Sequence, residues 1–208
     1  NLAEKNGLSM KYADKVFDIP FERSPFNTKN IGAYKQLKKI MKDEKYDIVH
    51  CHTPVGGILA RLAGRKFRKD GLRMIYTAHG FHFYDGAPKK NWIIYYPIEK
   101  FMSRYTDDLI TITEEDYKLA KDRNFKGNIH HVHGVGVNTD KFVKLSEEDR
   151  QKLRVDKGYT NEFIILCTGE LNKNKNQDTL IKAMKEVVKK HPEAKLLLAG
   201  NGPEHDNL

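Results

Sequence analysis

Residues 46–51, Tyr-Asp-Ile-Val-His-Cys, form a short apolar run that ends in polar residues. The run has the length and composition of a buried β-strand. Similar runs, separated by stretches of helical periodicity, recur at 72–77, 108–112 and 129–132. Strands that alternate with helices predict a parallel sheet covered by helices on both faces. The sequence therefore predicts an α/β fold for this part of the chain.

Helices are expected at 30–43, at 58–69, at 91–105 and directly after Thr113. Gly56 and Gly57 are interpreted as the opening of the second helix, and Pro97 is expected to bend or break the third. Thr113 is followed by Glu114, Glu115 and Asp116, which is the pattern of an N-cap with acidic residues in the first turn.

The pattern restarts in the last third of the chain, with a strand at 163–169, an amphipathic helix at 177–190 and a strand at 195–200. Two strands and one helix do not close a core by themselves. We therefore expect a first domain at 1–145, incomplete at its start, and the beginning of a second domain at 146–208. The chain is expected to be a fragment of a larger protein.

Composition excludes several classes of protein. Hydrophobic residues make up 39% of the 208 residues, too many for a disordered chain. No stretch approaches about 18 uninterrupted apolar residues, which argues against an integral membrane protein. The cysteines, Cys51 and Cys167, are too few for a disulfide scaffold and suit a reducing cytosol.

Positive charge is concentrated in the first part of the chain. The net charge is +9; residues 1–145 hold 26 Lys and Arg against 17 Asp and Glu, and residues 146–208 hold 11 of each. A basic face of this kind suits nucleic acid, a membrane surface or a phosphorylated small molecule. A solvated lysine-rich surface is the alternative.

Three polar stretches are candidates for chemistry. Residues 77–84, Thr-Ala-His-Gly-Phe-His-Phe-Tyr, follow a strand at the edge where open α/β sheets bind ligands, and they contain His79. A structural loop packed on its phenylalanines is the alternative. Residues 169–176 lie between a strand and a helix, a place for an anion, or else form a solvated loop. His50 and His52 share a strand face, but strand-end histidines in a cleft are favoured over a metal site.

Taken together, several motifs resemble the GT-B fold, family-four (group 1) retaining glycosyltransferases, in their capsule and exopolysaccharide branch. The motifs that carry the resemblance are 46–54, 77–84, 112–116, 133–142, 168–176 and 200–203. The resemblance implies two Rossmann-like domains: an acceptor-side first domain and a second domain that binds a nucleotide sugar, usually a UDP-sugar. It also implies transfer with retained anomeric configuration, and neither a cofactor nor a metal ion.

The resemblance also implies roles for individual residues. His79 corresponds to a catalytic histidine that reaches the donor sugar, and Lys175 to a lysine on the donor diphosphate. The other implied donor-binding residues are Gly169, Glu170, Gly134 and Val135, and the implied acceptor-side residues are His52, Phe81 and Tyr84. Glu170 and Asn176 depart from the family pattern, where many members have Arg and Gly. The family's paired-glutamate motif lies beyond residue 208.

The sequence thus predicts a cytoplasmic transferase that acts on a lipid-linked or polysaccharide-precursor acceptor, with an anionic membrane surface, but no nucleic acid, as a further partner. The 208-residue chain alone is expected to be inactive. One alternative is a non-catalytic membrane- or nucleic-acid-binding module, suggested by aromatic and basic residues interleaved over 81–105. Another is a GT-B UDP-sugar epimerase.

Overall fold

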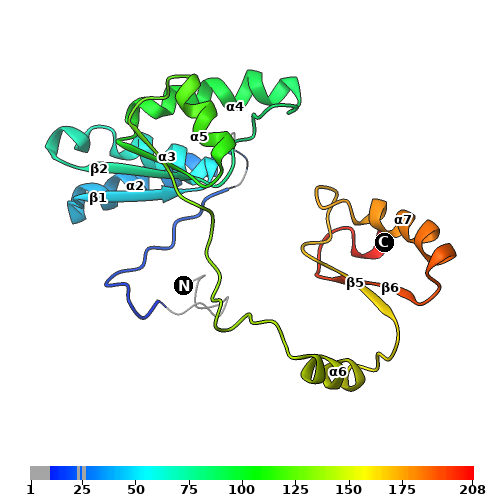
Figure 1. Ribbon diagram of the computed structural model, residues 1–208. Helices are drawn as coiled ribbons and strands as arrows, with labels where there is room; N and C mark the ends of the chain where they lie inside the picture. Colours follow the sequence, from blue (N-terminus) through cyan, green and yellow to red (C-terminus); the bar gives the residue numbers. More distant parts are fainter. Residues whose placement is uncertain (1–9, 23, 25–26) are drawn as a thin grey trace. The chain divides into compact units, whose positions relative to one another are not determined.

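The computed structural model describes residues 10–22, 24 and 27–208 (Figure 1). The chain forms two compact units, which divide between Gly136 and Val137. Each unit is an α/β arrangement around parallel strands, as the sequence predicts.

The first unit contains a four-stranded parallel sheet in the order β1-β2-β3-β4. Its strands are β1 (Ile48–His52), β2 (Arg73–Ala78), β3 (Asp108–Thr111) and β4 (Asn128–His131). All four predicted strands are confirmed, with ends that differ by one or two residues. Because the strands are parallel, their carboxyl ends meet at one edge of the sheet and their amino ends at the other.

Helices α2 (Lys29–Glu44), α3 (Pro54–Gly64), α4 (Lys89–Met102) and α5 (Glu114–Asp122) confirm the four predicted helices. Short 3₁₀ turns follow α3 at Phe67–Asp70 and α4 at Ser103–Tyr105. Helix α4 continues through Pro97 without a break. The Thr113 side chain accepts a hydrogen bond from the Asp116 N–H, so its predicted N-cap role is also confirmed.

The start of α3 was predicted wrongly. The helix begins at Pro54, so Gly56 and Gly57 lie inside it rather than ahead of it. Proline is well suited to the first helical turn, where its missing N–H is not needed. A Cβ atom on Gly57 would lie 2.6 Å from Cε2 of Tyr76, so this glycine permits close packing of α3 on the sheet.

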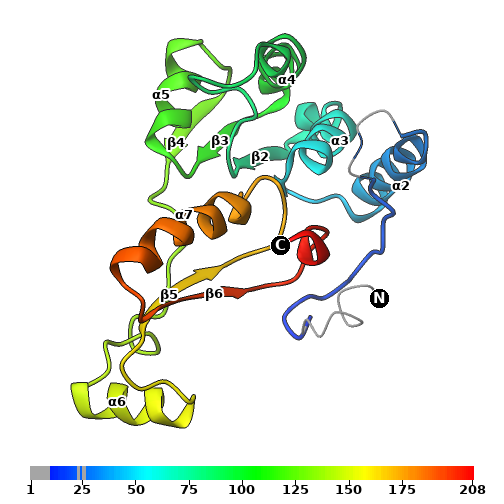
Figure 2. The same ribbon diagram turned by 90° about the vertical axis from the view of Figure 1, so that its right-hand side faces the viewer.

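The expectation of helices on both faces of the sheet is not met among the described residues. The face that packs on the helices buries Cys51, Met74, Tyr76 and Leu109. The opposite face is more open, and Ile48 on it is 57% exposed. Each crossover connects neighbouring strands in the same direction, and right-handed crossovers then place their helices on one side. Figure 2 shows α3, α4 and α5 on the same side of the strands.

The second unit comprises α6 (Glu147–Asp156), β5 (Phe163–Thr168), α7 (Gln177–Lys190), β6 (Ala194–Ala199) and a 3₁₀ turn at His205–Asn207. Strands β5 and β6 are parallel, and α7 has the predicted bounds. Phe163 and Leu166 of β5 are each 61% exposed. This two-stranded sheet therefore buries little, as expected of so few elements.

Candidate functional site

Three histidines gather at the carboxyl edge of the first sheet. His50 and His52 are two residues apart in β1, so they lie on one face, and β2 leads directly into His79. The His52 Nδ1 and His79 Nε2 atoms are 3.0 Å apart, within hydrogen-bond distance. The His50 and His52 rings have centroids 4.3 Å apart, and His50 Nε2 lies 2.8 Å from the Thr77 hydroxyl oxygen.

The contact between His52 and His79 holds one proton at most. A ring nitrogen donates when it carries hydrogen and accepts when it does not, so only one of the two facing nitrogens is protonated. Burial lowers the pKa of His52, and positive charge on His50 or His79 lowers that pKa further. The lowered pKa favours the neutral form of His52, and Nδ1 of His79 is not used in this bond.

The loop after β2 is anchored by its aromatic residues. Phe81 is buried and stacks on Phe83, with ring centroids 4.8 Å apart. The Phe81 N–H donates to Asp116 Oδ1 at 3.3 Å, which ties the loop to the start of α5. Gly80 has φ +142°, in the region that favours glycine. These contacts hold His79 at the end of β2 even though its side chain is exposed.

A cavity of about 570 Å³ borders this loop and is lined by His52, Gly80, Phe81 and residues of α3 and α4. The structure thus brings two predicted acceptor-side residues, His52 and Phe81, to one cavity. Tyr84 is not among the lining residues. Its side chain is 45% exposed, and its carbonyl oxygen accepts from Trp92 Nε1 at 3.2 Å.

In the second unit, the loop at 169–176 packs against the turn after β6. The Gly169 N–H donates to the Ala199 carbonyl, and the Leu171 N–H donates to the Asn201 carbonyl, each at 3.0 Å. A Cβ atom on Gly200 would collide with the Gly169 carbonyl oxygen, so the two turns approach backbone to backbone. This packing explains Gly200, whereas Gly169 is explained by its φ of +153°.

Asn172 organises the polar side of that loop. Its Nδ2 donates to Glu170 Oε2 at 2.8 Å, and its Oδ1 accepts from the Lys175 N–H at 2.9 Å. Cε of Lys175 lies 3.9 Å from where a Cβ of Gly169 would stand. Gly169, Glu170 and Lys175 therefore form one cluster ahead of α7, in which Glu170 is paired with an amide rather than a cation.

The two other predicted donor residues, Gly134 and Val135, lie at the end of the first unit. Gly134 has φ +53°, and its N–H donates to the Val132 carbonyl at 2.8 Å. Val135 is 80% exposed, so its side chain is free of packing within its own unit. The predicted donor residues are thus divided between the two units.

Models of glycosyltransferase families match both parts of the chain. The family model described as "Glycosyl transferase 4-like" matches residues 4–113, and the model described as "Glycosyl transferases group 1" matches residues 146–208. The chain belongs to the family-four, group 1 glycosyltransferases. Its parallel α/β units accord with the GT-B fold of that family.

Relatives of this glycosyltransferase chain include EpsD of Bacillus subtilis (strain 168), which carries the name of a glycosyltransferase. EpsD is 49% identical over 204 residues, a match that covers 97% of this chain and 54% of EpsD. An Escherichia coli protein named UDP-Gal:alpha-D-GlcNAc-diphosphoundecaprenol alpha-1,3-galactosyltransferase is 28% identical over 193 residues, covering 88% of this chain and 49% of that protein. The chain thus spans about half the length of these relatives.

A solved structure has the same fold. Anabaena Alr3699/HepE, crystallised with UDP, matches with a TM-score of 0.63 at 17% identity, over 84% of this chain and 45% of that one. At this identity the match concerns the fold alone.

Sequence reasoning missed several residues of this glycosyltransferase chain. Gln177 is buried at the start of α7, and its Nε2 donates to the Glu170 carbonyl at 3.0 Å. Its Oε1 has no hydrogen-bond partner among the described residues. Arg61 and Glu99 form a buried ion pair with Nη2 and Oε2 2.9 Å apart. No local motif marks these residues, because their roles arise from packing between distant elements.

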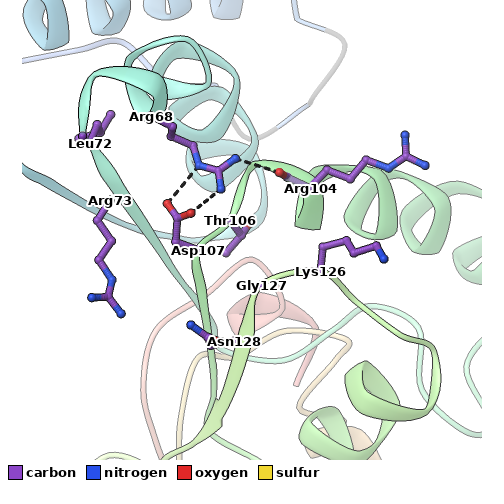
Figure 3. Close-up of a pocket in the computed structure, with 10 residues that line it drawn as sticks. Arg68, Leu72, Arg73, Arg104, Thr106, Asp107, Lys126, Gly127 and Asn128 are labelled. Carbon is purple, nitrogen blue, oxygen red and sulfur yellow. Dashed lines mark hydrogen bonds and ion pairs between the residues drawn. The ribbon is translucent and has the colours of Figure 1, made fainter.

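A second cavity, of about 730 Å³, lies at the amino edge of the first sheet (Figure 3). Arg68 is ion-paired with Asp107 there, and its Nη1 donates to the Arg104 carbonyl at 2.9 Å. In Figure 3 the Arg104 and Lys126 side chains point away from the Asp107 carboxylate. This basic cavity lies at the opposite edge of the sheet from the histidine cluster.

Two kinds of feature are absent from the described residues. No helix there combines the length and the apolar character needed to span a bilayer. No set of three or more His, Cys, Asp or Glu side chains in those ranges has an arrangement suited to a metal ion.

Proposed function

We propose that the protein transfers a sugar from a UDP-sugar to a lipid-linked or polysaccharide-precursor acceptor during exopolysaccharide or capsule biosynthesis. The observation that carries this proposal is the histidine cluster beside a cavity, at the carboxyl edge of a family-four first domain. The Escherichia coli relative is named for UDP-Gal and a diphosphoundecaprenol-linked GlcNAc, and HepE was crystallised with UDP. Both support the choice of donor and acceptor.

The two units divide the work in this proposal. In the first, His79 hydrogen-bonds the donor sugar near its anomeric carbon, and His52 fixes the orientation of the His79 ring. In the second, Gly169 and Lys175 hold the diphosphate, and the Lys175 ammonium stabilises the charge that develops on it. Glu170, beside them, accepts a hydrogen bond from a hydroxyl group of the donor. Gly134 and Val135 line the donor side at the end of the first unit. The protein's own cations meet the diphosphate charge, and no metal ion or cofactor takes part.

The transfer forms one bond and breaks one. An acceptor hydroxyl oxygen bonds to the anomeric carbon, the bond from that carbon to the diphosphate oxygen breaks, and its electron pair leaves with UDP. The hydroxyl proton passes to the departing diphosphate, so charge and atoms balance. The new glycosidic bond has the anomeric configuration of the donor. We place this reaction in the cytoplasm, at the inner face of an anionic membrane.

The test is a transfer assay with the full-length protein, UDP-sugars and a diphosphopolyprenyl-linked acceptor in phosphatidylglycerol vesicles. Lys175→Ala removes a cation from the diphosphate and should raise the Kd for UDP about tenfold, about 1.4 kcal/mol. Lys173→Ala, an exposed lysine two residues away in the same loop, is the matched control and should leave this Kd unchanged. Titration calorimetry measures both constants.

Several outcomes would contradict the proposal. Equal effects of the two lysine variants on UDP would remove Lys175 from the donor site. Loss of turnover in EDTA would contradict the metal-independent step, and an inverted product by NMR would contradict retention. Sugar release or epimer formation without acceptor would favour an epimerase. Vesicle binding that does not weaken as salt rises would contradict the membrane partner.

A further inference from the structure

The side chains that line the cavity beside His52 are suited to bind a small organic ring. Aromatic side chains of Tyr76, Phe81 and Tyr95 and aliphatic side chains of α3 and α4 line its volume of about 570 Å³. Ligand sites are commonly of this size and combine a largely apolar wall with a few polar groups that fix orientation. The polar groups of this cavity therefore decide which ligand it accepts.

The charged groups of the cavity wall are acidic. Glu22 and Glu99 line it, whereas no Lys or Arg does so within the described ranges. This is unexpected in a chain of net charge +9 whose excess lies entirely within residues 1–145. Each carboxylate is paired with a cation, Glu99 with Arg61 at 2.9 Å and Glu22 with Lys29 at 3.2 Å, so the wall offers no unpaired cation to a phosphate or diphosphate. The cavity is thus unsuited to the anionic part of a lipid-linked acceptor.

Glu99 is the most constrained of these polar groups. Its side chain is 9% exposed, and its Oε2 accepts from Arg61 Nη2 at 2.9 Å. Arg61 also donates its Nε–H to the Gly57 carbonyl at 3.0 Å, and its guanidinium lies 4.0 Å from the centroid of the Tyr76 ring. These contacts fix the carboxylate of Glu99, which is one of the residues that line the cavity.

Within the described residues no hydrogen bond to the other carboxylate oxygen of Glu99, Oε1, accompanies that from Arg61 to Oε2, and Oε1 is not among the fully buried unpaired atoms, so it keeps some exposure. A hydrocarbon chain in the cavity would bury this oxygen without a donor, and an unpaired charged oxygen is costly to bury. A ligand that brings a hydroxyl group would satisfy it. The wall therefore disfavours a lipid tail as well as a phosphate.

We propose that this cavity binds a neutral sugar ring of the acceptor, with a sugar hydroxyl donating to Glu99 Oε1. The C–H face of the ring packs on the aromatic wall, and the remaining hydroxyls face His52 at the rim. The inference rests on the proposed function, because the acceptor is the one that receives the transferred sugar. The inference adds that the protein recognises the acceptor by binding one of its sugars, and not by binding its lipid or its diphosphate.

The decisive variant replaces both members of the ion pair, Arg61→Met with Glu99→Met. A buried ion pair replaced by apolar residues of similar volume is often neutral for stability, so the fold should survive, and a thermal melt checks it. Saturation-transfer NMR on the full-length protein measures binding of methyl glucoside, methyl galactoside and methyl N-acetylglucosaminide. Decyl phosphate and inorganic pyrophosphate serve as lipid and phosphate probes, and Glu115→Gln, an exposed acid, is the control.

We expect the wild-type protein and the control to bind at least one glycoside and to prefer it to decyl phosphate and pyrophosphate. The double variant should bind that glycoside at least tenfold more weakly, with UDP affinity unchanged. Equal glycoside binding by the double variant, preference for decyl phosphate or pyrophosphate, or no binding of any glycoside would overturn the inference. Glycoside binding without UDP binding would instead contradict the proposed function and leave the sugar site standing.

Discussion

The two edges of the first sheet use charged and polar residues in opposite ways. At the amino edge, Arg68 is paired with Asp107, and Asp108 accepts hydrogen bonds from Arg73 at 2.6 and 3.1 Å. At the carboxyl edge, His52 contacts His79 at 3.0 Å, and no carboxylate bonds to either histidine among the described residues.

The difference separates structural from chemical polar groups. Asp108 of β3 also accepts from His130 Nε2 of β4 at 2.9 Å, so one buried carboxylate joins three strands. Within residues 10–22, 24 and 27–208, the hydrogen bonds and ring contacts of the three histidines at the other edge join them only to one another and to Thr77. Their exposed rings keep the capacity to bind a ligand. We therefore expect substitutions at the amino edge to lower stability and substitutions at the carboxyl edge to lower activity.

The largest expected effect is that of His79→Ala on transfer. Loss of a hydrogen bond to the donor sugar near the reacting carbon should lower kcat about 100-fold, about 2.7 kcal/mol, with a change in stability of about 0.5 kcal/mol or less. Initial rates with the full-length enzyme and urea unfolding measure the two quantities. His191→Asn, an exposed histidine at the end of α7, is the control. Unchanged kcat in His79→Ala would break the contrast between the edges.

The converse effect is expected for Asp108→Asn, which should lower the free energy of unfolding by about 2 kcal/mol. The amide keeps the shape but loses the charge that Arg73 and His130 bind. These bonds, with that of Arg73 foremost, hold the pKa of Asp108 below its ordinary value. The stabilisation is therefore complete above about pH 4 and is lost as the pH falls further, because the unfolded carboxylate takes up its proton first.

Urea unfolding of the wild type and Asp108→Asn at pH 7 and pH 3 measures this contribution. The difference in unfolding free energy between the two proteins should be smaller at pH 3 than at pH 7. The kcat of Asp108→Asn per folded molecule should equal that of the wild type. Asp122→Asn, an exposed aspartate of α5, is the control. A variant as stable as the wild type at pH 7 would show that the amino-edge pairs are not structural.

Most of the fold followed from local signals in the sequence. Helix α7 has its predicted bounds because its apolar residues recur at helical spacing and His191-Pro192 ends the pattern. The start of α3 could not be predicted from local signals, because the glycine at position 57 is required by close packing on the Tyr76 ring, which lies on another element. The position of the helices on a single face of the sheet was not predicted either. It depends on the strand order, which the alternation of strands and helices does not reveal.

The candidate site was predictable only in part. The position of His79 after a strand located the carboxyl edge, and spacing put His50 and His52 on one face. The bond between His52 and His79 depends on the register of β1 against β2, and the Arg61–Glu99 pair depends on how α3 packs on α4. Neither relation has a signal within a single window of sequence.

The smallest expected effect concerns His52 and sharpens the same contrast. Because burial and the neighbouring histidines lower its folded pKa, the unfolded chain binds a proton at this residue at higher pH than the folded chain does. Stability should therefore fall as the pH drops from 7 to 5, whereas the Asp108 contribution is lost only below about pH 4. His52→Asn should make the unfolding free energy less dependent on pH in that range, as measured by urea unfolding at both values. If the unfolding free energy of His52→Asn depended on pH as strongly as that of the wild type, the carboxyl-edge histidines would not differ from ordinary surface histidines.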